Sequence, residues 1–198
     1  MAGITESNPM ILSIDYPDRP LNRLTTFFRI ITLIPVGIIL GLISGGENAA
    51  GGLLFPPVVL MILFREKYPR WWFDWNIALT KFNMRVAGYL CLLTDEYPST
   101  DEEQAVHVNI RYPDVPNDLN RWLPLVKWLL AIPHYIVLAL LAVGAFFCVV
   151  VAWFAILFTG RYPRGLFDFV VGVYRWSLRV SAYAFLLTTD RYPPFSID

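Results

Sequence analysis

The residues of this chain that are suited to chemistry are few, and the most prominent form a matched pair. Arg29 and Lys127 each lie inside a long apolar run, less than two turns before a proline (Pro35 and Pro133). A charge at membrane depth is costly and often functional. Two alternatives follow: the side chain snorkels to lipid phosphates, or it joins an internal pair or a substrate site. We expect headgroup contact, because each residue is only one or two turns from the end of its run.

Metal chemistry has little support in the sequence. The chain has two histidines and two cysteines, which argues against a conventional transition-metal site within one chain. His134 has no counterpart in the other half of the chain, where Val36 stands. We expect a hydrogen-bonded or interface-facing histidine that marks a partner or polar site, with a ligand or proton-relay role as the alternative. Cys91 and Cys148 lie in apolar surroundings and are expected to be buried free thiols.

Familiar catalytic motifs do not occur in the sequence. It has no Walker loop, no dinucleotide fingerprint, no Gly-x-Ser-x-Gly elbow and no His-Glu-x-x-His. Its formal net charge of +0 gives no general attraction to nucleic acid. We therefore predict a non-enzymatic protein with no cofactor and no nucleic-acid partner.

An internal duplication positions these residues. The recurring segments are short, rich in aromatic, proline and charged residues, and about 94 to 98 residues apart. They are residues 14–18 with 110–114, Arg23 with Arg121, 34–35 with 132–133, 68–70 with 162–164, 73–74 with 167–168, Arg85 with Arg179, Tyr89 with Tyr183, and 92–98 with 186–193. The sequence thus predicts two repeats, at residues 10–98 and 106–195, related by an approximate twofold.

Composition indicates an integral membrane protein. Hydrophobic residues make up 56% of the chain and charged residues 16%, whereas ordinary soluble domains carry about 25% charged residues. Residues 24–44 and 122–142 are apolar runs of about 21 residues, long enough to cross a hydrocarbon core of roughly 30 Å. Residues 53–64 and 143–159 are shorter and are able to return across a locally thin bilayer.

Each repeat is predicted to have four parts: an extended segment, two apolar helices that form a transmembrane hairpin, and an amphipathic interfacial helix. The fold class is all-α integral membrane, with a short β segment before each repeat. Residues 106–110 alternate in polarity as a half-exposed strand does, and residues 10–14 are a weaker version able to pair with them. The hairpin turns are placed at 44–52 and near 142–144. The second turn is required because one helix over 122–159 would be about 57 Å long.

The fourth part of each repeat, residues 71–93 and 166–187, carries polar residues spaced to lie on one helix face. They are Asp74, Lys81 and Arg85 in the first copy and Asp168, Arg175 and Arg179 in the second. Such a helix either lies in the interface with this stripe toward headgroups or spans the bilayer against protein. Only the interfacial arrangement leaves the basic residues on one side, as the positive-inside rule favours. Both termini are then cytoplasmic, and the aspartates are expected to cap helices or build polar contacts.

Basic residues also mark the junction between each hairpin and its amphipathic helix. Lys67 and Arg70 flank a Tyr-Pro in the first repeat, and Arg161 and Arg164 flank one in the second. Tyr-Pro supplies an anchor and a turn at headgroup depth, and each basic residue adds on the order of 1 kcal/mol to binding of anionic lipid. The predicted headgroup contacts are Arg29, Lys127, Lys67, Arg70, Arg161, Arg164, Lys81, Arg85, Arg175 and Arg179.

The motifs of the second repeat carry a family resemblance. They are Gly160-Arg161-Tyr162-Pro163-Arg164, Phe167-Asp168, Arg175-Trp176, Arg179-Val180, Ala182-Tyr183, Leu186-Leu187 and residues 190–195. With them the chain resembles a bacterial membrane family described as domain of unknown function 4389. The first repeat fits more loosely, with Glu66-Lys67, Phe82 and Ser99 in place of Gly160-Arg161, Trp176 and Pro194. The resemblance covers nearly the whole chain and implies a bacterial inner-membrane protein, but it carries over no catalytic residue.

Three functions are consistent with these observations. The leading hypothesis is a non-enzymatic membrane scaffold or accessory subunit that packs against a larger membrane complex or organises lipids. Its expected partners are membrane lipids and other membrane subunits or further copies of the chain. The alternative is a small oligomeric transporter or channel for an anion or lipid, since tandem repeats with paired prolines suit a site at the repeat interface. A membrane enzyme that takes its metal or cofactor from a partner ranks third.

Overall fold

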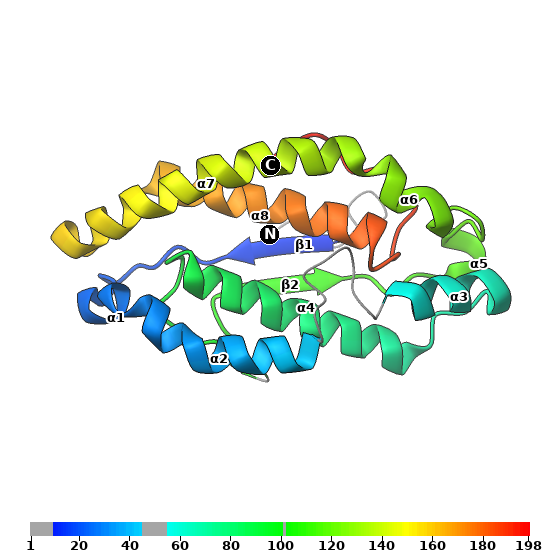
Figure 1. The fold of residues 1–198 in the computed structure, drawn as a ribbon, viewed down its shortest axis with the longest axis horizontal. Coiled ribbons are helices and arrows are strands. Elements are labelled where there is room, and N and C mark those ends of the chain that lie inside the picture. The colour runs from blue at the N-terminus through cyan, green and yellow to red at the C-terminus, as the bar shows by residue number, and fades with distance from the viewer. Residues whose placement is uncertain (1–9, 45–54, 101) are drawn as a thin grey trace.

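The computed structural model describes residues 10–44, 55–100 and 102–198. Its elements are, in chain order, β1 (Met10–Ile14), α1 (Arg23–Phe27), α2 (Arg29–Ser44), α3 (Phe55–Arg65), α4 (Arg70–Leu90), β2 (Val106–Ile110), α5 (Val115–Asp118), α6 (Pro124–Leu130), α7 (Ile132–Thr159) and α8 (Arg164–Ala184) (Figure 1). The long helices and both strands follow one common axis. The structure thus confirms a mostly helical fold with short β segments.

The two strands tie the repeats together. β1 belongs to the first repeat and β2 opens the second, and they pair antiparallel with Leu12 opposite Val108. Side chains of β2 alternate between buried and exposed, which is the period of a strand with one face on a core. The predicted pairing of the two extended segments is confirmed.

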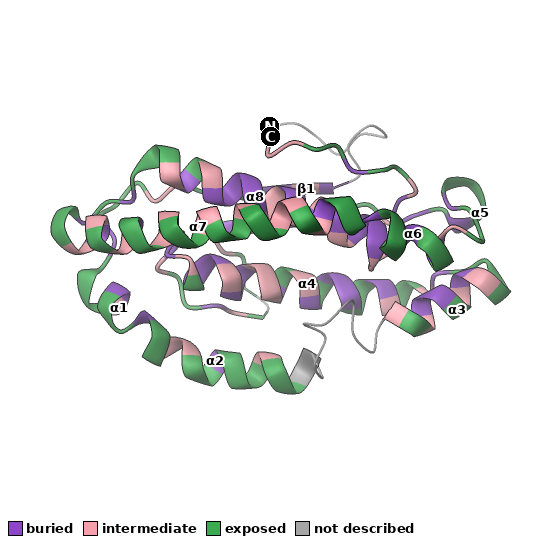
Figure 2. Cartoon of the chain, turned by 45° about the horizontal axis from the view of Figure 1, so that its top comes forward, coloured by how far each residue is buried: buried purple, intermediate pink, exposed green. Residues whose placement is uncertain are grey.

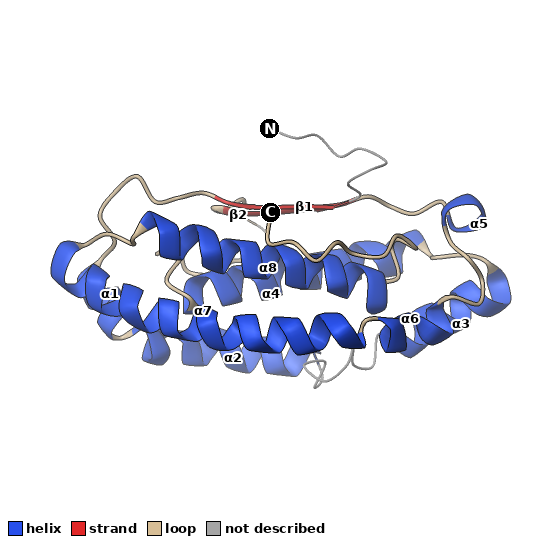
Figure 3. Ribbon diagram, turned by 90° about the horizontal axis from the view of Figure 1, so that it is seen from above, coloured by secondary structure: helices blue, strands red, loops and turns tan. Residues whose placement is uncertain are grey.

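The elements form three layers (Figure 3). The sheet is the first layer, and the inner helices α4 and α8 are the second, with α4 against β2 and α8 against β1. The outer layer holds α2 on α4 and α7 on α8. At the two ends of the molecule α1 contacts α7 and α3 contacts α6. The outer helices of the repeats therefore run in opposite directions and meet end to end, as an approximate twofold requires.

Local sequence determines where these helices begin and end. The Asn22 side chain accepts the backbone N–H of Leu24 and so caps α1. Pro69 and Pro163 precede α4 and α8 with φ of −55° and −61°, the range in which the proline ring holds the backbone. Gly160 ends α7 with φ of +76°, a left-handed conformation that glycine adopts without steric cost.

The outer helix of each repeat is interrupted, but at different places. In the second repeat Ala131 separates α6 from α7, and Pro133 lies in the first turn of α7, where its missing N–H costs no helical bond. In the first repeat the interruption comes at Phe28, and α2 continues through Pro35. The helix is thus broken next to its proline in one repeat only.

The predicted hairpin of the second repeat is wrong. Residues 142–144 lie inside α7, which is one helix of 28 residues, or about 42 Å. Residues 45–52 of the first predicted turn lie outside the described residues, and α3 lies beyond the end of α2 rather than back against it (Figures 1 and 2). The error came from the assumption that every apolar run crosses a bilayer and must therefore turn after about 30 Å.

The inner helices also differ from the prediction. α4 and α8 were expected at the membrane surface with a charged stripe outward, yet they form the middle layer, and about half of α8 is buried in the protein. Their apolar circumference is wide enough to pack on the sheet and on the outer helices at once. The amphipathic pattern was correct, but it reflects packing between two protein layers.

The outer layer leaves a large apolar surface uncovered (Figure 2). Of the described helices, α7 alone is both long and apolar enough to cross a membrane, and only 6% of its most apolar window is buried. Soluble monomers rarely expose apolar patches beyond a few hundred Å². A stripe of exposed side chains follows α7, namely Ile136, Leu140, Val143, Phe147, Val151, Phe154 and Phe158.

Candidate functional site

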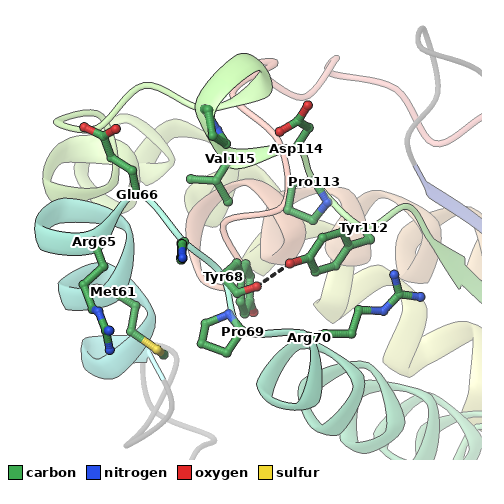
Figure 4. A pocket seen from close by; sticks show the side chains of 12 residues that line it. Met61, Arg65, Glu66, Tyr68, Pro69, Arg70, Tyr112, Pro113, Asp114 and Val115 are labelled. Atoms are coloured by element: carbon green, nitrogen blue, oxygen red, sulfur yellow. Dashed lines mark hydrogen bonds between the residues drawn. The ribbon is translucent and has the colours of Figure 1, made fainter.

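Two junctions at opposite ends of the molecule join the repeats through their Tyr-Pro segments. At one, the Tyr112 hydroxyl donates to the carbonyl oxygen of Tyr68, just before α4 (Figure 4). The Arg70 guanidinium lies 4.8 Å from the centroid of the Tyr112 ring, a cation–π distance. Burial raises the pKa of the Tyr68 hydroxyl to about 12. The Tyr68 hydroxyl therefore stays protonated to higher pH than an ordinary tyrosine does.

The second junction has the same contacts with the repeats exchanged. The Tyr16 hydroxyl donates to the carbonyl oxygen of Tyr162, and the Arg164 guanidinium lies 4.5 Å from the centroid of the Tyr16 ring. Each Tyr-Pro-Asp motif therefore docks on the Tyr-Pro-Arg motif of the other repeat. This explains why both motifs recur at matched positions in the sequence.

A hollow of about 700 Å³ opens at the first junction, between α3, the start of α4 and the segment that leads into α5 (Figure 4). Its charged lining consists of Arg65, Lys67 and Arg70 with Glu66 and Asp114. The three basic side chains are all exposed. The hollow therefore carries a small excess of positive charge at the surface.

A smaller hollow of about 230 Å³ lies at the second junction. Arg19, Arg161 and Arg164 line it with a single carboxylate, that of Asp18. The predicted headgroup residues Lys67, Arg70, Arg161 and Arg164 thus assemble into two related sites, two residues in each. The sequence did not indicate Arg19 and Arg65, because neither has a matched basic residue in the other repeat.

The basic side chains of the hollows are available to a ligand. Arg70 Nε lies 3.6 Å from Asp74 Oδ1, but the two side chains are 71% and 59% exposed, and an exposed pair of this kind is weak. Guanidinium groups bind phosphate oxygens through two parallel hydrogen bonds. Each hollow is therefore suited to a phosphate ester and has no evident nucleophile or acid–base pair.

Arg29, in contrast, is bound inside the protein. Its Nη2 lies 2.7 Å from Asp95 Oδ1, and its Nη1 donates to the Thr94 carbonyl oxygen at 3.0 Å. The guanidinium carbon lies 4.0 Å from the centroid of the Tyr89 ring. The other oxygen of Asp95 accepts the backbone N–H of Asn22 at 2.6 Å. The arginine thus fastens the start of the outer helix to the end of α4.

Lys127 makes the equivalent contacts in the second repeat. Its Nζ lies 2.6 Å from Asp190 Oδ1 and donates to the Thr189 carbonyl oxygen at 2.7 Å. The ammonium also lies over the Tyr183 ring, and the other oxygen of Asp190 accepts the backbone N–H of Asn120. Burial lowers the pKa of Lys127, and the Asp190 carboxylate partly offsets this effect.

The headgroup role predicted for Arg29 and Lys127 is therefore wrong, and the internal pair, the other alternative, is what forms. The reason lies at Leu92 and Leu187, which have φ of +63° and +54°. This left-handed turn in both repeats reverses the chain after the inner helix and brings the following aspartate to the basic residue. The signal was present in the sequence, since Thr-Asp recurs near the end of both repeats.

Two arginines of the predicted stripes also bind inside the protein. Arg85 Nη1 donates to the Ser99 carbonyl oxygen at 2.8 Å, and Arg179 Nη2 donates to the Ser196 carbonyl oxygen at 2.5 Å. Burial and the nearby Arg175 lower the pKa of Arg179. These side chains hold the segment that follows each inner helix. Arg85 is buried, so its predicted headgroup contact is wrong, whereas that of the half-buried Arg179 stays a prediction.

The remaining members of the stripes differ among themselves. Arg175 Nε donates to the Leu12 carbonyl oxygen at 3.2 Å and so fastens α8 to β1; the residue is half-buried, and its headgroup contact stays a prediction. Lys81 is exposed on α4, and its headgroup contact stays a prediction. Asp168 is exposed, as is Asp74, and neither lines a hollow described above.

His134 is a hydrogen-bonded core residue. Its side chain is fully buried, its Nδ1 accepts the Nε1–H of Trp176 at 3.1 Å, and its ring stacks on Phe195 with centroids 4.0 Å apart. In the first repeat Val36 is buried against Phe82 instead. The histidine and the tryptophan thus replace an apolar pair together.

The thiols and carboxylates do not form a metal centre in the described part of the chain. There, no group of three His, Cys, Asp or Glu side chains is close enough to hold an ion. Cys91 and Cys148 are free, as predicted, but both are half-buried where buried thiols were expected. The Cys91 sulfur lies 3.1 Å from the Tyr174 hydroxyl.

Comparison with known proteins identifies a family to which the chain is similar. A family model described as Domain of unknown function (DUF4389) matches residues 23–100 and 122–196. Each matched segment covers most of one predicted repeat, without its opening strand, and the double match supports the duplication. No curated protein and no solved structure matches the chain.

Proposed function

Since the chain belongs to the DUF4389 family, with one copy of the domain in each repeat, and membership defines no activity, we propose a function from its geometry. The protein is a non-enzymatic membrane scaffold that lies in one leaflet of the bilayer and holds anionic phospholipids at both ends. The observation that carries this proposal is the outer layer, in whose longest helix few of the apolar residues are buried.

The distribution of charge supports an orientation parallel to the membrane. Basic hollows lie at both ends of the long axis, while polar residues such as His107 and Asn109 are exposed on the sheet. A perpendicular orientation would place these strand residues, together with Lys81 of α4, at the depth of lipid tails, where charge is costly. In the parallel orientation only the outer helices enter the hydrocarbon, as interfacial helices do.

The two hollows then lie where the outer helices leave the hydrocarbon. Exposed Lys67 and Arg70 at one end and Arg161 and Arg164 at the other reach lipid phosphates. Each contributes about 1 kcal/mol to binding of an anionic membrane, or about a fivefold change in affinity. Both ends of the described chain lie on the sheet side (Figure 3), and in this orientation they share one aqueous compartment.

A vesicle-binding experiment tests the headgroup role. The variant Lys67→Gln/Arg70→Gln/Arg161→Gln/Arg164→Gln is compared with the original chain by flotation with phosphatidylglycerol and phosphatidylcholine vesicles. We expect the variant to lose most of its preference for phosphatidylglycerol and to keep its binding to phosphatidylcholine. Lys81→Gln removes one exposed charge away from both hollows and should lower the preference by no more than the roughly fivefold effect of one basic residue. An unchanged preference in the folded fourfold variant would contradict the proposal.

Packing against a larger membrane complex or further copies of the chain remains part of the proposed role. The apolar outer layer is available to such a partner as well as to lipid. Transport of an anion or lipid remains a separate prediction, tested by flux in proteoliposomes.

A further inference from the structure

A groove of about 910 Å³ runs between the two repeats on the side of the outer helices. Phe27 and Ile30 line it from the first repeat, Phe146 and Trp153 from α7, and Val170 from α8. The lining reaches along α7 from Tyr135 to Phe154, which is about 28 Å at 1.5 Å per residue. Small side chains on α7, those of Ala139, Ala142 and Ala145, give the groove its depth.

Both ends of this groove carry polar groups: Tyr135, whose buried hydroxyl has no partner among the described residues, lies at one end, and Thr26 lies at the other. At the Thr26 end, the Trp153 Nε1–H donates to the Thr26 carbonyl oxygen at 3.1 Å. Thr26 is fully buried, yet its Oγ1 has no hydrogen-bond partner among the described residues. The same holds for Nε of Arg29, which is 3% exposed and also lines the groove. Buried polar groups normally have partners, so two orphaned donors three residues apart indicate an acceptor that a ligand supplies.

The symmetry of the fold adds to this argument. The residue that corresponds to Thr26 in the second repeat is Pro124, and Lys127 corresponds to Arg29. Proline has no hydroxyl, and the lysine side chain has a single nitrogen, with no counterpart of Nε. The two donors at Thr26 and Arg29 are thus a feature of the first repeat alone and are not required by the shared fold.

We propose that the groove holds one acyl chain of a membrane phospholipid, with the ester carbonyl accepting from Thr26 Oγ1 and Arg29 Nε. This inference rests on the membrane location proposed above. The groove is continuous with the uncovered apolar surface of α7, so a lipid tail enters it from the surrounding leaflet. A tail that spans one leaflet is about 15 Å long and fits within the groove when its ester lies at Thr26.

Three variants test the proposal by native mass spectrometry of protein purified in mild detergent. The original chain is expected to retain one phospholipid. Ala142→Trp fills the groove and should lose it, whereas Val143→Trp, which adds the same bulk to the exposed face of α7, should keep it. Thr26→Val removes the hydroxyl and should weaken retention about fivefold, the effect of one lost hydrogen bond, without lowering thermal stability.

Equal lipid retention by Ala142→Trp and Val143→Trp, with both folded, would overturn the proposal. A chain that carries no lipid and occurs as a dimer, which Ala142→Trp converts to a monomer, would also overturn it and assign the groove to a second copy. The proposed function has its own test. It depends on the basic hollows and is measured as the preference for phosphatidylglycerol vesicles, not as lipid retained in the groove. Ala142→Trp should keep that preference while it loses the retained lipid.

Discussion

Lys127 and Asp190 form an ion pair, with Nζ 2.6 Å from Oδ1, that occupies the place of the Arg29–Asp95 pair in the other repeat. In both repeats a buried cation near the start of the outer helix meets the carboxylate that follows the inner helix. The cation also binds a threonine carbonyl oxygen and lies over a tyrosine ring. Conservation of these contacts through the duplication, despite exchange of lysine for arginine, indicates that they hold each repeat together.

We predict that Asp190→Asn destabilises the protein by about 2–4 kcal/mol, because it leaves the Lys127 ammonium buried without a counter-charge. Denaturant unfolding in detergent measures the change. Asp168→Asn is the matched control, since Asp168 is exposed on α8, and it should alter stability by less than about 0.5 kcal/mol. Equal stability of the two variants would show that the pair contributes little.

A pH dependence follows from the lowered pKa of Lys127. Between the folded-state pKa and the unfolded value near 10.5, the unfolded chain binds more protons, so stability rises with pH. The Asp190 carboxylate raises the folded-state pKa of Lys127. Without it this pKa is lower still, so the pH range over which stability rises begins at a lower pH. Between about pH 7 and 9, where tyrosines are protonated in both states, stability of Asp190→Asn should rise more steeply than that of the original chain. Parallel pH profiles would contradict this assignment.

The His134–Trp176 pair offers a test of the symmetry itself. Trp176→Phe alone leaves His134 Nδ1 without its donor and should cost about 1–3 kcal/mol. His134→Val/Trp176→Phe installs the residues of the first repeat, Val36 and Phe82, and should recover part of that loss. A double-mutant cycle measures the coupling, for which about 1 kcal/mol or more is expected. Strictly additive effects would show that the two residues act independently.

Sequence patterns predicted the contacts that depend on local order. The alternation at residues 106–110 identified β2 and its pairing with residues 10–14, and the matched motifs located both repeats. They could not predict the orientation of the outer helices, since the apolar content of residues 132–159 is the same for a helix that spans and one that lies flat. Gly144 suggested a turn, but it lies inside α7 and faces the ring of Phe169 on α8. A Cβ atom at this position would lie 3.6 Å from that ring, so the glycine allows the two helices to pack closely.

In the candidate site, too, some features could be predicted from the sequence and others could not. Lys67, Arg70, Arg161 and Arg164 were identified because they flank a repeated Tyr-Pro, and the structure assembles them into two hollows. The roles of Arg29 and Lys127 depended on where the chain returns after each inner helix. The left-handed turns at Leu92 and Leu187 set that return. The recurring Thr-Asp marked the carboxylates, but leucine gives no sequence signal for such a backbone conformation.

The central claim is that α7 lies parallel to the membrane surface, and spin-label depth measurements test it most directly. Single cysteines replace Ile136, Phe147 and Phe158 on the exposed stripe of α7, in a background that lacks Cys91 and Cys148. Oxygen and nickel-chelate accessibility in phosphatidylglycerol bilayers then gives the depth of each label. We predict three similar depths within one leaflet. A spanning helix would instead separate the labels at 136 and 158 by about 33 Å, with 147 near the bilayer centre, and that result would contradict the account.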